Sequence, residues 1–261
     1  MATAIRVPLR RIPDAQPSRL FPLHSYYDAL FAAHGPQHWW PGRSRFEIIV
    51  GAILTQNTSW KNVERAIANL RAAKLLCPAA IHSVSSASLA KHLRPSGYFR
   101  QKSKTLKSFI AFLYESHGGS LNRLFATPTT ALRTQLLAVR GIGPETADSI
   151  LLYAGRHLVF VIDTYSRRIL ARHNLLPAEV QTNSRRSYEQ IRSLFESQLP
   201  RDPQLFNEFH ALIVQTGKLH CRKSNPLCST CPLSRFLPAG HHPSTTDLSP
   251  VASHQSRITL P

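Results

Sequence analysis

Apolar residues recur along the middle of the chain with the spacing of helices that bury one face. They fall at positions i, i+3, i+4 and i+7, which share one side of a helix with 3.6 residues per turn. Five such stripes cover residues 46–54, 63–70, 106–113, 188–199 and 205–213. Gly217 is expected to end the last helix, because glycine is typical of helix C-termini. Only residues 158–162 look like a strand, and one short strand cannot build a sheet, so the pattern predicts an all-α fold.

The two ends of the chain lack this periodicity and are rich in proline and polar residues. We interpret residues 1–20 as a disordered basic arm and residues 238–261 as a disordered tail around a folded domain of residues 21–237. A transit peptide is the alternative interpretation of the Arg-rich arm. The sequence shows neither a run of ~18 apolar residues that could cross a bilayer nor the hydrophobic core of a secretory signal. We therefore expect a cytoplasmic or nucleoid-associated protein of bacterial type without a membrane partner.

The charge of the chain indicates a polyanionic partner. The 261 residues include 32 Lys and Arg against 14 Asp and Glu, a formal net charge of +18. Each phosphate that a basic residue neutralises releases counterions, so such an excess favours nucleic acid. A generic basic protein, or an anionic membrane surface, would also fit the charge. The sequence has no basic amphipathic helix with a broad apolar face, which disfavours the membrane.

The most informative stretch is a glycine turn between two expected helices. One helix ends near Arg140, and Pro144 suits the first position of the next. Between them lies the turn Gly141-Ile142-Gly143. Its glycines let the backbone approach a phosphate, the next helix start offers free N–H groups, and the isoleucine can lock the helices together. The stretch predicts a helix-hairpin-helix that grips the DNA backbone without reading its sequence.

An aspartate follows this hairpin at the end of the apolar segment. Asp163 stands where another helix, containing Ile169 and Leu170, is expected to begin. Aspartate is a good N-cap, and capping alone would explain it. The same position favours an ionised carboxylate, which can stabilise an oxocarbenium-like sugar and direct water to it. Both roles are compatible, so Asp163 is also a candidate catalytic residue.

These motifs together resemble the endonuclease III superfamily of DNA glycosylases over residues 21–233. The hairpin with Thr146 and Ala147, followed about 20 residues later by Asp163, matches the family's hallmark. The resemblance implies a two-lobed helical fold with a DNA-binding cleft between the lobes. It also implies a six-helix lobe within about residues 45–155 and a second lobe from both flanks. Residues 53–60 (ILTQNTSW) match the family's early helix end, which would place Gln56 near the base stack.

The same resemblance assigns residues to the DNA backbone. Residues 96–104 (SGYFRQKSK) match the family's loop near DNA, with Lys102 and Lys104 available for phosphates. Contacts from the hairpin itself are expected through the following residues: Gly141, Ile142, Gly143 and Thr146.

One position predicts the mechanism. Bifunctional members of the family carry a lysine two residues after the second hairpin glycine, and its amine forms a Schiff base with the sugar. Glu145 stands there in this chain, and a carboxylate cannot form a Schiff base. We therefore expect a monofunctional glycosylase that uses water, leaves an abasic site and has little or no lyase activity.

An aromatic pair points to one branch of the family. Trp39 and Trp40 precede the first helix and, with Glu145 and Tyr165, resemble the 3-methyladenine glycosylase branch, where the pair lines the base pocket. An alkylated purine is cationic, and tryptophan faces attract cations by ~0.5–2 kcal/mol. Simple packing against the helix near Phe46 is the alternative interpretation of the two tryptophans.

Three cysteines near the C-terminus indicate an incomplete metal motif. Cys221, Cys228 and Cys231 match the first three ligands of the family's [4Fe–4S] site, but Leu237 stands at the fourth position. A cluster with an outside ligand and an empty site are both open. A third possibility is a zinc site completed by one of three histidines: His220, His241 or His242. Four cysteines in this arrangement are not a disulfide framework and favour a reducing compartment.

The sequence thus predicts a base-excision DNA glycosylase, expected to act as a monomer on double-stranded DNA with a damaged base. The preferred lesion is an alkylated purine such as 3-methyladenine. An oxidised pyrimidine, a mismatched base and a DNA-binding protein without catalysis are the rival hypotheses. Asp163 at the family's distance from the hairpin favours an enzyme over a simple binding module.

Overall fold

A computed structural model describes residues 23–176, 180 and 184–238, and these residues contain no β-strand. The predicted arm lies outside the described residues, and so does the predicted tail apart from residue 238. The prediction of an all-α fold is confirmed. The helices of the described chain are α1 (Leu23–His34), α2 (Arg45–Leu54), α3 (Trp60–Ala72), α4 (Pro78–Ser83), α5 (Ser86–Leu93), α6 (Phe99–His117), α7 (Leu121–Ala126), α8 (Thr129–Ala138), α9 (Pro144–Ser149), α10 (Thr164–Arg172), α11 (Arg185–Gln198) and α12 (Pro203–Leu219). None of these helices is both long and apolar enough to pass through a bilayer.

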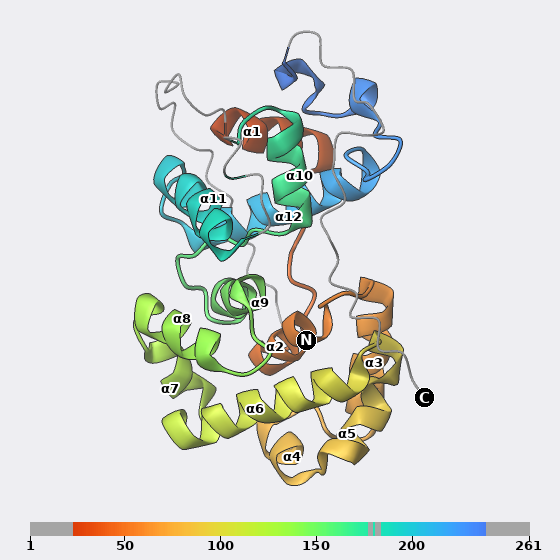
Figure 1. Cartoon of the computed structure of the whole chain (residues 1–261), viewed down its shortest axis with the longest axis vertical. Coiled ribbons are helices and arrows are strands. Elements are labelled where there is room, and N and C mark those ends of the chain that lie inside the picture. Colours follow the sequence, from red (N-terminus) through yellow and green to blue (C-terminus); the bar gives the residue numbers. More distant parts are fainter. Residues whose placement is uncertain (1–22, 177–179, 181–183, 239–261) are drawn as a thin grey trace, which may run out of the picture.

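The helices form two lobes (Figure 1). In one lobe α6 packs against α4 and α5, and α2 packs against α3 and α6. In the other lobe α12 packs against both α1 and α10. Helix α9 lies between the two groups (Figure 1) and contacts α2 and α8. The first lobe is continuous in sequence, whereas the second combines segments from both sides of it.

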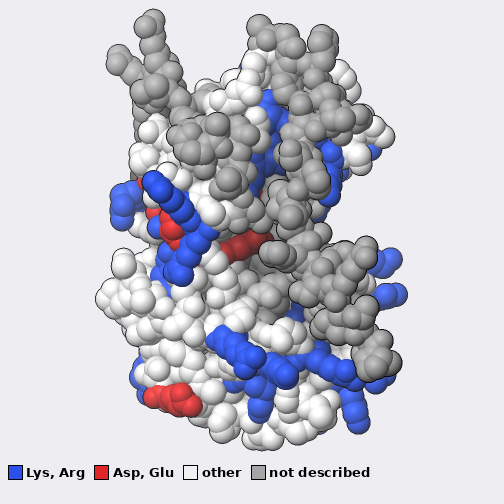
Figure 2. All heavy atoms as spheres, viewed as in Figure 1, with Lys and Arg blue, Asp and Glu red and all other residues white. Residues whose placement is uncertain are grey.

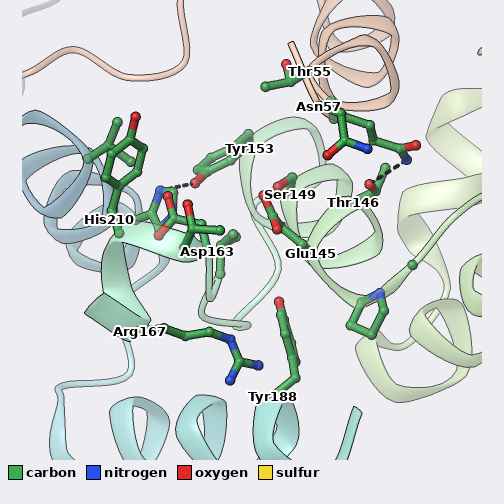
Figure 3. A pocket seen from close by; sticks show the side chains of 18 of the residues that line it. Thr55, Asn57, Glu145, Thr146, Ser149, Tyr153, Asp163, Arg167, Tyr188 and His210 are labelled. Atoms are coloured by element: carbon green, nitrogen blue, oxygen red, sulfur yellow. Dashed lines mark hydrogen bonds and ion pairs between the residues drawn. The ribbon is translucent and has the colours of Figure 1, made fainter. Parts of the chain in front are cut away.

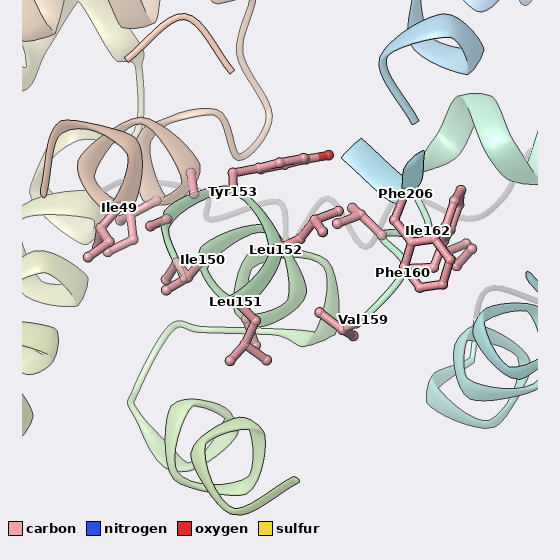
Figure 4. Close-up of a cluster of buried hydrophobic side chains, with 14 of the residues drawn as sticks. Ile49, Ile150, Leu151, Leu152, Tyr153, Val159, Phe160, Ile162 and Phe206 are labelled. Carbon is pink, nitrogen blue, oxygen red and sulfur yellow. The ribbon is translucent and has the colours of Figure 1, made fainter. Parts of the chain in front are cut away.

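An apolar segment connects the lobes through the buried core (Figure 4). Helix α9 continues as a π-helical turn, Ile150–Ala154, and the chain then runs extended to α10. Phe160 on the extended part stacks on Phe195 with ring centroids 4.1 Å apart. Its backbone N–H donates to Glu196 Oε1, and the N–H of Ile162 donates to the hydroxyl of Tyr188. Side chains of α11 therefore satisfy these donors, which explains how a strand-like sequence is extended and buried without a partner strand.

The last helix does not end at Gly217, and this prediction was wrong. Helix α12 continues to Leu219, with Gly217 buried inside it. A Cβ at Gly217 would collide with the ring of Tyr165 on α10. The glycine therefore serves the close approach of α10 and α12 instead of stopping the helix.

Candidate active site

A cavity of about 810 Å³ lies between the two lobes. Its wall combines the end of α2, the start of α3 and α9 with the starts of α10 and α11 and one side of α12. Figure 2 shows acidic atoms within the hollow between the lobes, and Lys and Arg side chains around it and over the lobe that contains α6. The cavity is within the 300–1,000 Å³ range of small-molecule pockets, so it can hold one nucleobase.

The predicted hairpin forms one edge of this cavity. Gly141 has φ of +89°, and a Cβ there would collide with Thr105 of α6, so the position requires glycine. Ile142 is 5% exposed and packs into the core, as the lock between the helices requires. Gln56 at the end of α2 donates to the carbonyl of Gly141 at 3.1 Å and to Thr146 Oγ1 at 2.9 Å. Gln56 therefore connects the end of α2 to the hairpin by hydrogen bonds and also lines the cavity.

Asp163 caps α10 and faces the cavity (Figure 3). Its Oδ1 accepts a 2.7 Å hydrogen bond from the N–H of Ser166 and a 2.9 Å bond from the Ser166 hydroxyl. The side chain is 11% exposed. Its Oδ2 lies 3.7 Å from Nε2 of His210 on α12. The cap and the catalytic position predicted for this residue are therefore compatible in one geometry.

Glu145 lies in the same cavity on the first turn of α9 (Figure 3). The residue is exposed where it faces the open cavity, although many protein atoms lie around its carboxyl. Loss of water, followed by the negative charge of Asp163, raises its pKa to about 8, and Arg167 acts in the opposite direction. This raised pKa favours the protonated form of Glu145 at neutral pH, in which the carboxyl can donate a hydrogen bond.

Four aromatic rings form the opposite wall. Trp39 and Trp40 line the cavity with Trp60 and Tyr153, and neighbouring centroids of these rings lie 5.0–6.4 Å apart. Trp40 also packs on the bare backbone of Gly51 in α2. Packing against the helix and lining the cavity are therefore compatible for this pair, and the role of the two tryptophans as a base pocket stays a prediction.

Several other cavity residues could not be predicted directly from the sequence. Trp60 is the last residue of the motif at residues 53–60, and its packing against Trp39 and Trp40 is visible only in the fold. His210 lies within an apolar stripe of α12, and the sequence does not show which residue its buried imidazole contacts. Arg167 and Lys218 also line the cavity, with Lys218 Nζ 5.7 Å from the centre of the Trp39 ring.

Two residues predicted to bind the DNA backbone are engaged elsewhere. Lys102 is 3% exposed, and its amine donates to the carbonyls of Leu54 and Ser96 at 2.9 and 2.6 Å. The predicted phosphate contact of Lys102 was therefore wrong, because its amine connects the end of α2 to the loop before α6. Thr146 is also buried, and its hydroxyl accepts from Gln56 instead of facing outward. Lys104, two residues further along α6 and so on the other side of the helix, is exposed as expected.

Tyr165 was expected in the base pocket and lines the cavity. Its ring packs on Gly217 and lies beneath the guanidinium of Arg168, 5.0 Å from the ring centre. The tyrosine is therefore fixed at the junction of α10 and α12.

The three C-terminal cysteines lie together but do not form a four-thiolate site. Cys221 and Cys231 are buried, Cys228 is half-buried, and all three carry free thiols. They line a cavity of only about 10 Å³ with Leu237, which supplies no ligand atom. Within residues 23–176, 180 and 184–238, no group of three or more His, Cys, Asp or Glu is arranged to hold a metal ion. The described residues therefore do not fit a [4Fe–4S] cluster with four protein ligands.

The zinc alternative also finds no support among these residues. His220 lines the same small cavity, but its Nδ1 pairs with the Thr230 hydroxyl at 3.4 Å. His241 and His242 lie outside the described residues.

The chain belongs to the HhH-GPD superfamily of base excision DNA repair proteins, whose sequence profile matches residues 50–199. It is 42% identical to a candidate DNA repair glycosylase of Methanocaldococcus jannaschii, over 82% of this chain and 94% of that protein. These matches place the chain among the DNA repair glycosylases of the superfamily.

Solved structures agree with this fold. The 3-methyladenine DNA glycosylase MagIII of H. pylori, bound to 1,N6-ethenoadenine, superposes with a TM-score of 0.64 and 27% identity, covering 75% of this chain and 97% of that one. A non-covalent complex of endonuclease III with DNA superposes with a TM-score of 0.68 at 19% identity, covering 82% of this chain and 93% of that one. The second likeness bears on the fold alone, and it confirms the predicted endonuclease III-like architecture.

Proposed function

We propose that this protein is a monofunctional DNA glycosylase that hydrolyses the N-glycosidic bond of a flipped, damaged purine. The observation that carries the proposal is the pairing of Asp163 with Glu145 in one aromatic-walled cavity. Asp163 supplies the carboxylate, and Glu145 occupies the position where the family's bifunctional members have their lysine. A flipped base entering the cavity would bring its sugar to the rim, where Asp163 caps α10.

Asp163 acts on the sugar. As the glycosidic bond breaks, positive charge develops on the sugar ring, and the fixed carboxylate stabilises it without reorganisation. Water then attacks the sugar carbon, and the carboxylate orients this water. Departure of the base leaves an abasic site, because Glu145 cannot form the Schiff base that leads to strand cleavage.

The wall of the cavity favours a flat, electron-poor base. Trp39, Trp40 and Trp60 offer ring faces that attract a cation by ~0.5–2 kcal/mol. The negative charge of Asp163 adds to this attraction. An alkylated purine is cationic and leaves readily, so it needs no strong general acid. The likeness to MagIII, a 3-methyladenine DNA glycosylase bound to 1,N6-ethenoadenine, supports a modified adenine.

A neutral base is the second candidate, and Glu145 is the observation that favours it. With its pKa raised to about 8, this group is protonated at neutral pH and can donate to an acceptor atom of an uncharged base. Such a base could be an ethenoadenine, an oxidised pyrimidine or a mismatched base. The two candidates predict opposite pH dependence.

Contact with double-stranded DNA is proposed through the hairpin and the basic surface beside it. The backbone at Gly141 and Gly143 is exposed at the edge of the cavity. Lys104 is exposed on α6, in the lobe over which Figure 2 shows Lys and Arg side chains. These groups would hold the phosphates of one strand independently of sequence, as expected for a monomer that scans DNA.

A panel of duplexes tests the proposal. The purified protein is incubated with DNA carrying 3-methyladenine, ethenoadenine, thymine glycol or a mismatch, and released bases are identified by mass spectrometry. We expect release of a modified adenine and an intact abasic strand. Release from none of the duplexes would contradict the glycosylase function.

Borohydride trapping tests the monofunctional mechanism in the same reactions. We expect no covalent adduct between protein and DNA. Among the described residues Lys218 is the lysine that lines the cavity. An adduct that disappears in Lys218→Ala would show lyase chemistry through that amine and overturn the monofunctional assignment.

A further inference from the structure

The two oxygens of Asp163 have different surroundings. Oδ1 accepts both hydrogen bonds from Ser166, at 2.7 and 2.9 Å, and these bonds fix it at the start of α10. The group facing Oδ2 is the imidazole of His210, with Nε2 at 3.7 Å. This distance is too long for a hydrogen bond but short enough for an N–H dipole to act on the carboxylate. The orientation of Oδ2, the oxygen not fixed by the cap, therefore depends on His210.

His210 is buried and held from its other side. Its Nδ1 lies 2.6 Å from the hydroxyl of Tyr153 on the π-helical turn (Figure 3). The ring of Phe160 packs edge-on against the imidazole, with centroids 6.3 Å apart. Nε2 is buried and, in the described part of the chain, has no hydrogen-bond partner. A buried nitrogen without a partner is costly, so its retention beside a catalytic carboxylate points to function.

The carboxylate that faces His210 indicates where the imidazole proton lies. Asp163 Oδ2 lies 3.7 Å from Nε2, and its negative charge favours the proton on that nitrogen. Nδ1 is then the acceptor, and the Tyr153 hydroxyl gives its hydrogen to it. Burial raises the pKa of Tyr153 well above its usual value, so the phenol keeps this hydrogen. The neutral imidazole then carries its proton on Nε2, directed toward Asp163.

We propose that His210, held by Tyr153, is a positioning residue that orients Asp163 Oδ2 for the sugar. The inference rests on the proposed glycosylase function. A polar chain runs from Tyr153, which lines the aromatic wall of the cavity, through His210 to Asp163. The chain joins the wall that would hold the base to the carboxylate that would act on the sugar. In this proposal His210 acts through Asp163 and takes no direct part in the reaction.

Substitutions at both members of the pair test the proposal by single-turnover base release. His210→Leu removes the Nε2 donor, and we expect a rate about 100-fold lower with unchanged DNA affinity, the loss that a misplacement of ~1 Å can cause. His210→Gln places an amide N–H near Nε2 and should recover most of the rate. Tyr153→Phe keeps the ring but frees Nδ1, and we expect a smaller loss, about 10-fold.

The chain offers a matched control. Tyr26 and His173 form a second buried pair with the same hydroxyl-to-Nδ1 distance of 2.6 Å, outside the cavity. Tyr26→Phe removes the same kind of hydrogen bond and should lower the melting temperature as Tyr153→Phe does, without changing the rate of base release. Equal rate losses in both tyrosine variants would show a general effect on folding and overturn the proposal.

A second control separates positioning from structure. In an Asp163→Asn background, His210→Leu should cause no further loss, because its effect passes through the carboxylate. The proposal is overturned if His210→Leu keeps the wild-type rate, or if Gln is as slow as Leu and the loss adds to that of Asp163→Asn.

Nitrogen chemical shifts of the His210 imidazole provide a readout without activity. We expect the proton on Nε2 in the free protein, and a proton on Nδ1 would overturn the proposal. If the wild-type protein releases no base from any duplex, the proposed glycosylase function is wrong. The position of the imidazole proton still tests whether His210 presents an N–H to Asp163.

Discussion

The cavity around Asp163 and the cysteine segment, residues 221–231, each bring several polar groups together, but these groups are used differently. In the cavity, Asp163 Oδ2 and the Glu145 carboxyl face a space of about 810 Å³. In the cysteine segment, Arg172 donates to Cys221 Sγ at 3.1 Å and to the carbonyls of Arg222 and Lys223 at 2.7 and 3.3 Å, beside a cavity of about 10 Å³. One region leaves polar groups open to a ligand, whereas in the other they bond to one another.

The largest expected effect is at Asp163. Asp163→Asn should lower base release by at least about 1,000-fold, or ~4 kcal/mol, because the sugar cation loses its carboxylate. Asparagine still accepts the Ser166 hydrogen bonds as an N-cap, so the fold and DNA affinity should be retained. Single-turnover kinetics and a binding titration check this. Base release at the wild-type rate would remove the functional contrast between the two regions.

Substitutions beside the cysteine segment should lower the stability of the protein and leave base release nearly unchanged. Arg172→Met removes a buried guanidinium that donates to Cys221 Sγ and to two backbone carbonyls, and we expect a loss of about 1–3 kcal/mol in the free energy of unfolding. The residue lies at the far end of α10 from Asp163, so single-turnover base release below the melting temperature should change little. Urea denaturation measures the first effect. A loss of base release without a loss of stability would contradict this division.

Features that depend on neighbouring residues could be predicted from the sequence, whereas contacts between distant residues could not. The glycine turn and the capping position of Asp163 could be predicted because local sequence determines them, whereas the expectation for the tryptophan pair came from the family resemblance. Tyr153 and His210 could not be found, because their contact joins a π-helical turn to a helix 57 residues later. The burial of Lys102 was missed for a similar reason. A lysine beside a basic loop suggests a phosphate contact, but only packing shows the two carbonyls that its amine satisfies.

A more moderate effect is expected at Glu145 as pH changes. Its raised pKa, about 8, keeps the carboxyl protonated below that pH and ionises it above. For a cationic alkylated purine, wild-type affinity and release should therefore rise several-fold as pH increases through 8, since the ionised group attracts the base. Glu145→Gln should stay level over this range. A fall in the wild-type rate would instead indicate a neutral base that accepts a hydrogen bond from protonated Glu145.

The smallest effect is expected at Cys228, the half-buried thiol of the cysteine segment. If the segment is held by Arg172 and by packing, Cys228→Ser should change the melting temperature and the rate of base release only slightly, because no ligand is lost. Iron and zinc analysis of the wild-type protein, with a visible spectrum, belongs to the same experiment. Stoichiometric metal that is lost with Cys228→Ser would show that three cysteines recruit an outside ligand. The cysteine segment would then also bind a ligand, and its contrast with the cavity would no longer hold.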